Sequence, residues 1–442
     1  MAAAEIIMIT IILMLVLVLL GVHIGVALSL MSVLGIWLVV DNIEVAVSIL
    51  STTSFQAIRE YAFGVIPLFV LMGLLMNMSN ASSELYNAFH VLLRRVKGGL
   101  GIATVGANAV FATITGVSVA SAAVFSKIAL KPMLELKYDK KLALGTIAGS
   151  SILGMLIPPS LLLIIYGMLS DVSIGKMFVA GIIPGILLSL VYCIGIYTIA
   201  RLKPEMAGGT GGFVPSGSNG WTKADLKMLF RPWAFGAVVV LMLGGLYGGF
   251  FTATEAGGVG VFGALLLVFL KRRFKGKAFL KILIETGYTS ASILFLLIAA
   301  QMYSRMMSMS GVLNLINDFV ISLDVAPIVV IFIFVLIMLI LGTILDSTSI
   351  LLICMPIMVP IVTALGYDLI WFGIVTVVAV EMGLLTPPFG LVVYAMKSAL
   401  GSEATIEDIF RGSFPFLVMM FIMLLILIFV PSLSTWLPAM SQ

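Results

Sequence analysis

Long apolar runs recur along this chain, and several of them are interrupted by small and polar residues. The run from Leu142 to Leu169 is long enough to cross a bilayer, because a helix rises about 1.5 Å per residue. Near its middle, however, residues 149–160 read GSSILGMLIPPS. Each proline removes a backbone donor and obstructs the preceding turn, so we predict a broken helix over 142–169. Because unpaired backbone groups are costly in lipid, the break is expected inside protein or along a polar cavity.

A second break of the same kind is predicted in the other half of the chain. The apolar run 369–396 contains the segment GLLTPP at residues 383–388. At an offset of about 229 residues, the matching pairs are Gly154 with Gly383, Pro158 with Pro387 and Pro159 with Pro388. At an offset of about 228, they are Thr115 with Thr343, Ser121 with Ser349 and Pro132 with Pro360. Two breaks at matching places indicate two repeats and a transport site between them.

A segment rich in small and polar residues precedes each broken helix. In the first half its centre, TITGVSVAS at residues 113–121, is too polar to face lipid. Basic residues stand at both of its ends, and Lys and Arg accumulate on the cytoplasmic side of membranes. We therefore predict a re-entrant hairpin over 98–131 with its tip near Gly116. By symmetry a second hairpin is expected over 327–361, with its tip near Asp346.

The two halves differ in their basic residues. Residues 94–141 contain eight Lys and Arg, whereas the corresponding stretch between Arg305 and Lys397 contains none. This asymmetry predicts that the two repeats have opposite orientations in the membrane, with both chain termini outside.

These patterns predict an all-α polytopic membrane protein made of two inverted-topology repeats, each with a re-entrant hairpin and a Pro-Pro-broken transmembrane helix. The first repeat covers 1–202 and the second 232–442, and a stretch rich in Gly, Pro and Ser makes 203–231 a cytoplasmic linker. Each repeat should also hold scaffold helices and a helix lying at the membrane interface. We place the interfacial helices at 82–96 and 279–285, the latter followed by a separate span near 293–307.

Composition supports this class and excludes others. The chain is 62% hydrophobic and 10% charged, with a mean hydropathy of +1.24, which no soluble domain has. The net charge of +4 is spread over short loops and does not indicate nucleic-acid binding. Cys193 and Cys354 lie in apolar runs and are expected to be small buried hydrophobes. No phosphate-binding loop, metal-binding cluster or nucleophile elbow occurs, so we expect a non-enzyme without a resident cofactor.

Hydroxyl groups and backbone carbonyls gather at the predicted tips and breaks. Such oxygens suit a hard cation such as Na⁺, and half-helix N-termini suit an anion. The predicted sodium-binding residues are Thr115, Gly116, Ser118, Gly149, Ser150, Ser151, Gly342, Thr343, Asp346, Met382 and Thr386. The predicted substrate-binding residues are Ser121, Pro158, Ser160, Ser347, Ser349, Glu381 and Pro387. The alternative is that these small polar residues only pack helices together.

Asp346 and Glu381 are the acids of the second group. Acids inside a membrane are costly and usually functional, so we predict that both are ligands of the site or its near neighbours. The alternative is a structural carboxylate that hydrogen-bonds a broken helix end.

Four motifs together resemble the large membrane subunit of tripartite ATP-independent periplasmic (TRAP) transporters, over nearly the whole chain. They are IPPS at 157–160, GTILD at 342–346, TPP at 386–388 and FTATEA at 251–256, where the family usually has Pro in place of Ala253. The resemblance implies an elevator-type, sodium-driven importer of a small organic acid in a bacterial or archaeal inner membrane. It also implies two partners, a separate small four-helix membrane subunit and a soluble periplasmic substrate-binding protein.

An organic-acid substrate needs positive counter-charge in a low-dielectric site, and neither tip carries Lys or Arg. We therefore expect at least two sodium ions per cycle, one at each tip, with the substrate carboxylate between them. A stand-alone sodium/carboxylate symporter and a non-transporting membrane scaffold are the alternative interpretations.

Overall fold

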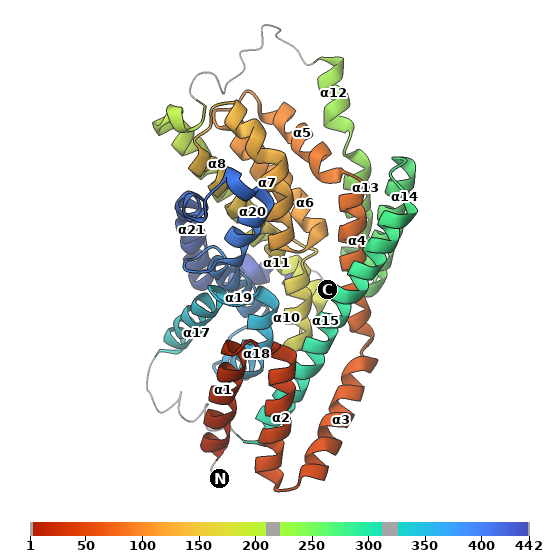
Figure 1. The fold of residues 1–442 in the computed structure, drawn as a ribbon, viewed down its shortest axis with the longest axis vertical. Coiled ribbons are helices and arrows are strands. Elements are labelled where there is room, and N and C mark those ends of the chain that lie inside the picture. Colours follow the sequence, from red (N-terminus) through yellow and green to blue (C-terminus); the bar gives the residue numbers. More distant parts are fainter. Residues whose placement is uncertain (1–2, 209–221, 312–325, 441–442) are drawn as a thin grey trace.

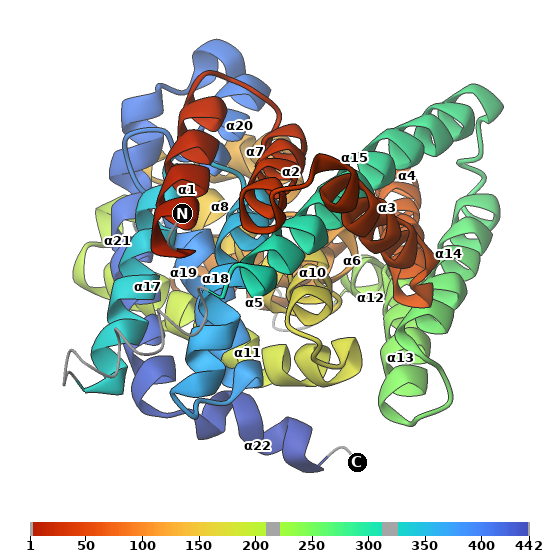
Figure 2. The same cartoon turned by 90° about the horizontal axis from the view of Figure 1, so that it is seen from below.

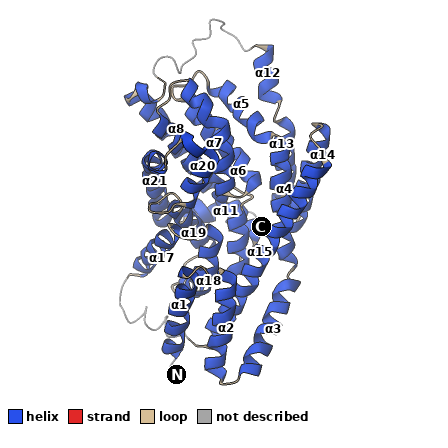
Figure 3. Ribbon diagram, viewed as in Figure 1, coloured by secondary structure: helices blue, strands red, loops and turns tan. Residues whose placement is uncertain are grey.

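The computed structural model of the chain describes residues 3–208, 222–311 and 326–440. Within these ranges the fold is helical and no strand is formed (Figure 3). Seven helices of the described part are long and apolar enough to cross a membrane, and one helix pair bent by 41° is an eighth candidate. The predicted all-α polytopic membrane class is confirmed.

The first three helices of the chain lie at the lower end of the molecule in Figure 1, and the fourth lies above them. They are α1 (Ala3–Leu19), α2 (Ile24–Val40), α3 (Ile43–Arg59) and α4 (Val65–Met78), with a 3-10 turn at Tyr61–Gly64 before α4. The sequence did not predict α3, because polar residues are scattered through it and no long apolar run marks it. The side chain of Asn42 caps α3 by accepting hydrogen bonds from the Glu44 and Val45 amides, which favours a helix there.

The next helices form the first hairpin. Helix α5 (Ala81–Leu93) lies across the upper end of the molecule in Figure 1 and is followed by α6 (Gly99–Thr115) and α7 (Ser118–Glu135). The turn between α6 and α7 is at Gly116, whose φ of +58° is left-handed and suits a residue without a Cβ atom. The sequence placed the tip at this residue.

The first broken helix follows directly. It consists of α8 (Lys140–Ser151), α9 (Leu153–Leu156) and α10 (Leu161–Leu169), and the backbone leaves the helix at residues 157–160, around a cis Pro158–Pro159 bond. The long helix α11 (Ile174–Leu202) then returns to the end that carries α5.

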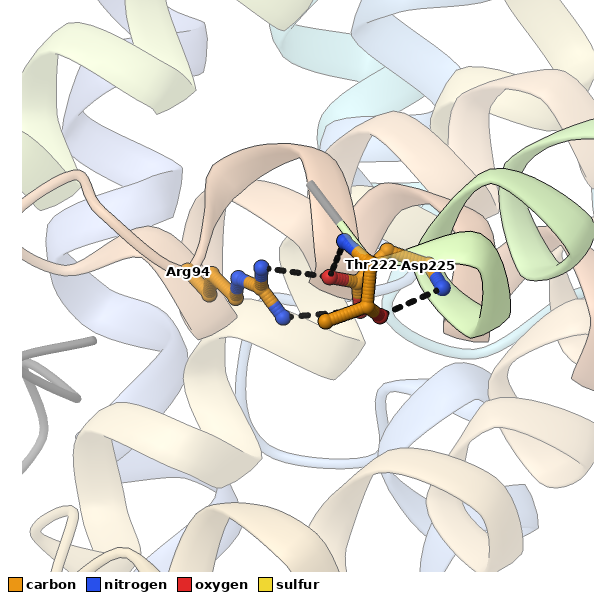
Figure 4. A network of polar contacts seen from close by, with 3 residues as sticks. All are labelled: Arg94, Thr222 and Asp225. Atoms are coloured by element: carbon orange, nitrogen blue, oxygen red, sulfur yellow. Dashed lines mark hydrogen bonds and ion pairs between the residues drawn. The ribbon is translucent and has the colours of Figure 1, made fainter. Parts of the chain in front are cut away.

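Part of the expected linker is helical. Residues 209–221 lie outside the described ranges, but Lys223–Phe230 forms α12 within the segment predicted as a linker. The reason is local, since Thr222 and Asp225 form a capping box at its start. Arg94 at the end of α5 binds both carboxylate oxygens of Asp225, at 2.8 and 2.7 Å (Figure 4). This bidentate ion pair attaches α12 to α5 across 131 residues of sequence.

The second half starts with three helices, α13 (Trp233–Tyr247), α14 (Ala253–Leu270) and α15 (Gly276–Met309). The predicted separate interfacial helix at 279–285 is wrong, because α15 is one continuous helix of 34 residues. Residues 286–292 between the two predicted segments contain no proline, so the hydrogen-bond ladder runs through them. At the start of α14, Thr252 and Glu255 form a capping box, so this helix entry forms with Ala253 in place of proline.

The hairpin and the broken helix then occur a second time, in the same order. The hairpin is α17 (Pro327–Gly342) and α18 (Ser347–Ala364), and the broken helix is α19 (Leu369–Gly383) and α20 (Leu391–Leu400). The second break includes a cis Pro387–Pro388 bond. A 3-10 turn (Gly401–Glu403), α21 (Ile406–Phe429) and α22 (Ser432–Met440) complete the described chain.

The two halves pack into each other at their broken helices. Helix α10 of the first half packs on α18 of the second, and α20 of the second half packs on α7 of the first. Helices α8 and α21 also approach closely, since a Cβ atom at Gly145 would lie 1.9 Å from the Gly412 carbonyl oxygen. Glycine at both positions lets the two backbones touch. Seen from below, α18 and α19 lie well inside the molecule, whereas α13 and α14 form one edge (Figure 2).

Candidate ion and substrate site

Each hairpin tip rests against the helix break of its own half. A Cβ atom at Gly116 would lie 3.2 Å from the Leu161 nitrogen, and one at Gly342 would lie 2.8 Å from the Gly383 Cα atom. The Gly390 amide also donates a hydrogen bond of 3.3 Å to the Thr343 carbonyl. The structure thus brings together the tips and breaks from which the candidate site was assembled.

A buried amide organises the first cluster. Asn108 of α6 donates from Nδ2 to the Ser150 hydroxyl of α8 at 2.9 Å, and its Oδ1 accepts from the Ser121 hydroxyl of α7. All three side chains are fully buried. Sequence reasoning missed Asn108, although a single amide inside the small-residue run at 99–115 was a usable signal. The network ties both hairpin helices to the broken helix.

Several other candidates of the first half bond to nearby backbone. The Ser151 hydroxyl donates to the Ala148 carbonyl at 2.7 Å. Ser160 caps α10 by accepting from the Leu163 amide at 3.3 Å, and it donates to the Met155 carbonyl. A Cβ atom at Gly149 would meet the Phe416 ring at 2.7 Å, so this residue packs against α21. Thr115 is half-buried beside the tip, and Pro158 is buried within the break.

The second cluster contains a carboxylate that is completely buried. Glu381 of α19 accepts a hydrogen bond of 2.7 Å from the Ser347 hydroxyl through Oε1. Its Oε2 atom has no hydrogen-bond partner, and the carboxylate has no ion pair, among the residues that the structure describes. The Ser118 hydroxyl lies beside the same carboxylate. Like Oε2, it makes no hydrogen bond of normal geometry to a residue that the structure describes. Ser118 and Ser347 begin α7 and α18, so Glu381 lies where the two hairpins meet.

Asp346 has a different environment from Glu381. It is the N-cap of α18, accepting from the Ser349 amide at 3.1 Å and from the Ser349 hydroxyl. This is the helix-end contact that the sequence left as an alternative. The residue is nevertheless exposed, and it lines a cavity of about 620 Å³ together with His23, Thr289 and Ser292. That cavity separates the second tip from α15 and from the turn between α1 and α2.

The two breaks differ in exposure. Pro158, Pro159 and Ser160 are buried, whereas Pro387, Pro388 and Phe389 are exposed, Phe389 by 53%. Beside the second break, the Thr343 and Thr386 hydroxyls donate to the Ile340 and Met382 carbonyls, both at 2.8 Å. Met382 itself is buried. In this conformation the second break is therefore the more accessible of the two.

The donor set is made of oxygens. Hydroxyls, one amide and one buried carboxylate suit a hard monovalent cation. Among the described residues, no group of three His, Cys, Asp or Glu side chains is placed to hold a metal ion of another kind.

Comparison with known proteins identifies the family. Residues 11–433 match the family model described as "Tripartite ATP-independent periplasmic transporter, DctM component". The chain belongs to this family.

Curated relatives of this TRAP component are named as large permease proteins. The C4-dicarboxylate TRAP transporter large permease protein DctM of Pseudomonas aeruginosa is 32% identical over 87% of this chain and 88% of its own length. The sialic acid TRAP transporter large permease protein SiaM of Vibrio cholerae is 29% identical, over 86% of this chain and 87% of its own. The 2,3-diketo-L-gulonate TRAP transporter large permease protein YiaN of Escherichia coli is 28% identical, over 88% and 89% respectively. These names confirm the prediction that the chain is a transporter permease and not an enzyme.

A solved structure shares the fold of this TRAP component. The crystal structure of the Alcanivorax borkumensis YdaH transporter has a TM-score of 0.57 and 15% sequence identity, covering 89% of this chain and 88% of that one. At this identity the likeness supports the architecture alone.

Proposed function

We propose that this protein is the large membrane component of a sodium-coupled TRAP importer in a bacterial or archaeal inner membrane. The observation that carries the proposal is the buried Glu381 carboxylate at the junction of the two hairpin tips. A buried carboxylate without a positive partner costs several kcal/mol, so a site of this kind favours a bound cation. Hydroxyls of Ser118 and Ser347 beside it supply further oxygens.

The proposed substrate is a small organic acid. The relatives are named for C4-dicarboxylates, sialic acid and a diketogulonate, which are all acids. Because residues 113–121 and 342–349 contain no Lys or Arg, sodium ions at the tips would supply the counter-charge for the substrate carboxylate. We propose at least two sodium ions per cycle, with the substrate between the tips and in contact with the break residues.

The proposed partners are a small membrane subunit and a soluble periplasmic binding protein. The family is tripartite by description, and the chain matches its DctM component. Helices α13 and α14 expose large apolar side chains, including Val240 at 71% and Phe262 at 69%. We propose that the small subunit or lipid covers this edge. We also propose that the soluble protein delivers the substrate at the side of the molecule opposite α5.

The proposed mechanism is elevator-like movement of the two hairpins and broken helices against α1–α4 and α13–α15. Support comes from the repeated order of hairpin and broken helix, and from the reciprocal packing of α10 on α18 and α20 on α7. Together with the eight-to-none distribution of basic residues, this arrangement favours inverted repeats with α5 at the cytoplasmic face.

Single cysteines, in a variant without Cys193 and Cys354, would test orientation and movement together. Three exposed positions serve as sites, namely Glu44 in the first turn of α3, Asn87 on α5 and Phe389 in the second break. We expect an impermeant thiol reagent to label Glu44→Cys only from outside and Asn87→Cys only from inside. Phe389→Cys should change its accessible side when sodium and substrate are supplied. Labelling of Asn87→Cys from outside would reverse the orientation, and a fixed accessibility of Phe389→Cys would contradict the elevator.

Sodium dependence of uptake is the direct test of the proposed function. In proteoliposomes containing both partners, Ser150→Ala and Thr343→Ala should raise the sodium concentration needed for half-maximal uptake. Each substitution removes one oxygen near a tip, and one lost ligand is expected to cost roughly 1–2 kcal/mol, or about 5- to 30-fold. Asp346→Asn should act in the same direction, because asparagine keeps the helix cap but not the charge.

Matched controls separate ion binding from helix stability. Ser189→Ala and Thr198→Ala on α11 remove hydroxyls that bond a carbonyl one turn back, as Thr343 also does, but outside the site. They should leave sodium dependence unchanged. Equal uptake driven by a proton gradient in sodium-free buffer would contradict sodium coupling, and strong uptake by this chain without partners would favour a stand-alone symporter.

A further inference from the structure

A polar cavity outside the hairpin tips lies where α5 meets the ends of α13 and α14. Its volume is about 260 Å³, and three cations line it, Arg231 between α12 and α13 and Lys271 and Arg273 after α14. The same cavity is lined by Glu84 and Asn87 of α5 and by Asn80, which directly precedes that helix. The elements that form it gather at the end of the molecule that carries α12 (Figure 1).

The cavity carries uncompensated positive charge. Lys271 is paired with Glu84 at 2.5 Å, and both side chains are only 19% exposed. Within the described ranges, Arg231 and Arg273 form no ion pair. Two guanidinium groups without carboxylate partners, beside the side-chain amides of Asn80 and Asn87, favour an anionic ligand with several acceptor oxygens.

The cavity also lies at the border of an apolar surface. Phe230 and Trp233, on either side of Arg231 in sequence, are 65% and 66% exposed, and Leu270, directly before Lys271, is 66% exposed. Tryptophan and basic residues mark the boundary between hydrocarbon and headgroups in membrane proteins. A charged cavity that borders exposed apolar helix ends matches a ligand with an anionic head and apolar tails.

We propose that this cavity binds the headgroup of an anionic phospholipid, with its phosphate against Arg231 and Arg273. The acyl chains would lie along the exposed faces of α13 and α14. A free phosphate offers the same headgroup chemistry, but the flanking Phe230, Trp233 and Leu270 favour the lipid. The inference rests on the proposed cytoplasmic orientation of α5, because anionic lipids concentrate in that leaflet, and it does not depend on sodium coupling.

Native mass spectrometry of the full-length chain in detergent tests the proposal by lipid titration. The wild-type protein should bind phosphatidylglycerol more tightly than phosphatidylcholine. The double variant R231Q/R273Q should weaken phosphatidylglycerol binding about 30-fold, since each basic residue contributes roughly a fivefold factor. Binding of phosphatidylcholine should not change. The matched control K275Q/K277Q removes the same charge from exposed residues that do not line the cavity, and it should keep the preference.

Three results would overturn the proposal. One is an equal loss in the control variant, which would indicate diffuse surface attraction. Another is displacement of the lipid by inorganic phosphate at the same concentration, which would indicate a free-anion site. The third is a double variant that keeps the wild-type preference. If the double variant does not fold, R273Q alone should weaken phosphatidylglycerol binding about fivefold, and no change there would contradict the site. Failure of the sodium test would leave all of these outcomes unaffected.

Discussion

Glu381→Gln is expected to raise the sodium concentration for half-maximal uptake by about 100-fold. The carboxylate is fully buried, with one oxygen bound to Ser347 and the other without a partner among the described residues. Removing one charge from a buried ion pair costs about 3–5 kcal/mol, so a change of about 100-fold, or about 2.7 kcal/mol, is the lower end of the expected effect. The measurement is sodium-dependent uptake in proteoliposomes with both partners, normalised to the amount of reconstituted protein.

The glutamine variant should still fold, because its carbonyl oxygen can accept the Ser347 hydrogen bond. Glu407→Gln is the matched control, since it makes the same chemical change on an exposed side chain of α21. It should leave sodium dependence unchanged. If Glu381→Gln keeps the wild-type sodium dependence, then the carboxylate holds no sodium ion, and its role is structural or protonic.

Gly383→Val is expected to reduce uptake by about 100-fold through displacement of the second hairpin tip. A Cβ atom at Gly383 would lie 2.6 Å from the Gly342 Cα atom and 3.0 Å from the Leu339 carbonyl oxygen. The tip would have to move away from the break, which would also lengthen the 3.3 Å contact between the Gly390 amide and the Thr343 carbonyl. A displacement of about 1 Å at a site of fixed geometry commonly costs about two orders of magnitude in activity.

Two measurements separate this effect from misfolding. They are the uptake rate and the elution profile of the purified protein in size-exclusion chromatography. Gly287→Val on α15 is the matched control, because a Cβ atom there meets no atom within 4 Å and the residue lies outside the α13–α14 edge proposed for the small subunit. Both variants should elute as the wild type, while only Gly383→Val loses uptake. Uptake by Gly383→Val within a factor of two of wild type would show that close contact between tip and break is not required.

Local chain chemistry made part of the site predictable. A proline pair ends a helix wherever it occurs, and a glycine can take the left-handed conformation of Gly116, so both breaks and the first tip followed from the sequence. Long apolar runs predicted most helices, because such a run is also a local feature of the sequence. The errors arose where the local signal was weak. Helices α3 and α12 begin at the capping residues Asn42 and Thr222, and no proline interrupts α15.

Only the tertiary structure decided which oxygens share a cluster. Asn108 joins Ser121 to Ser150, and Glu381 meets Ser118 from a segment more than 200 residues away. Asp346 and Glu381 are equivalent in the sequence as acids within the membrane, yet one caps an exposed helix end and the other is fully buried. Apolar runs and capping residues decide which segments become helices, and both are local features of the sequence. Burial and pairing of a polar group depend on which helices pack around it, and this is set by close contacts such as those of Gly145 with Gly412 and Gly342 with Gly383.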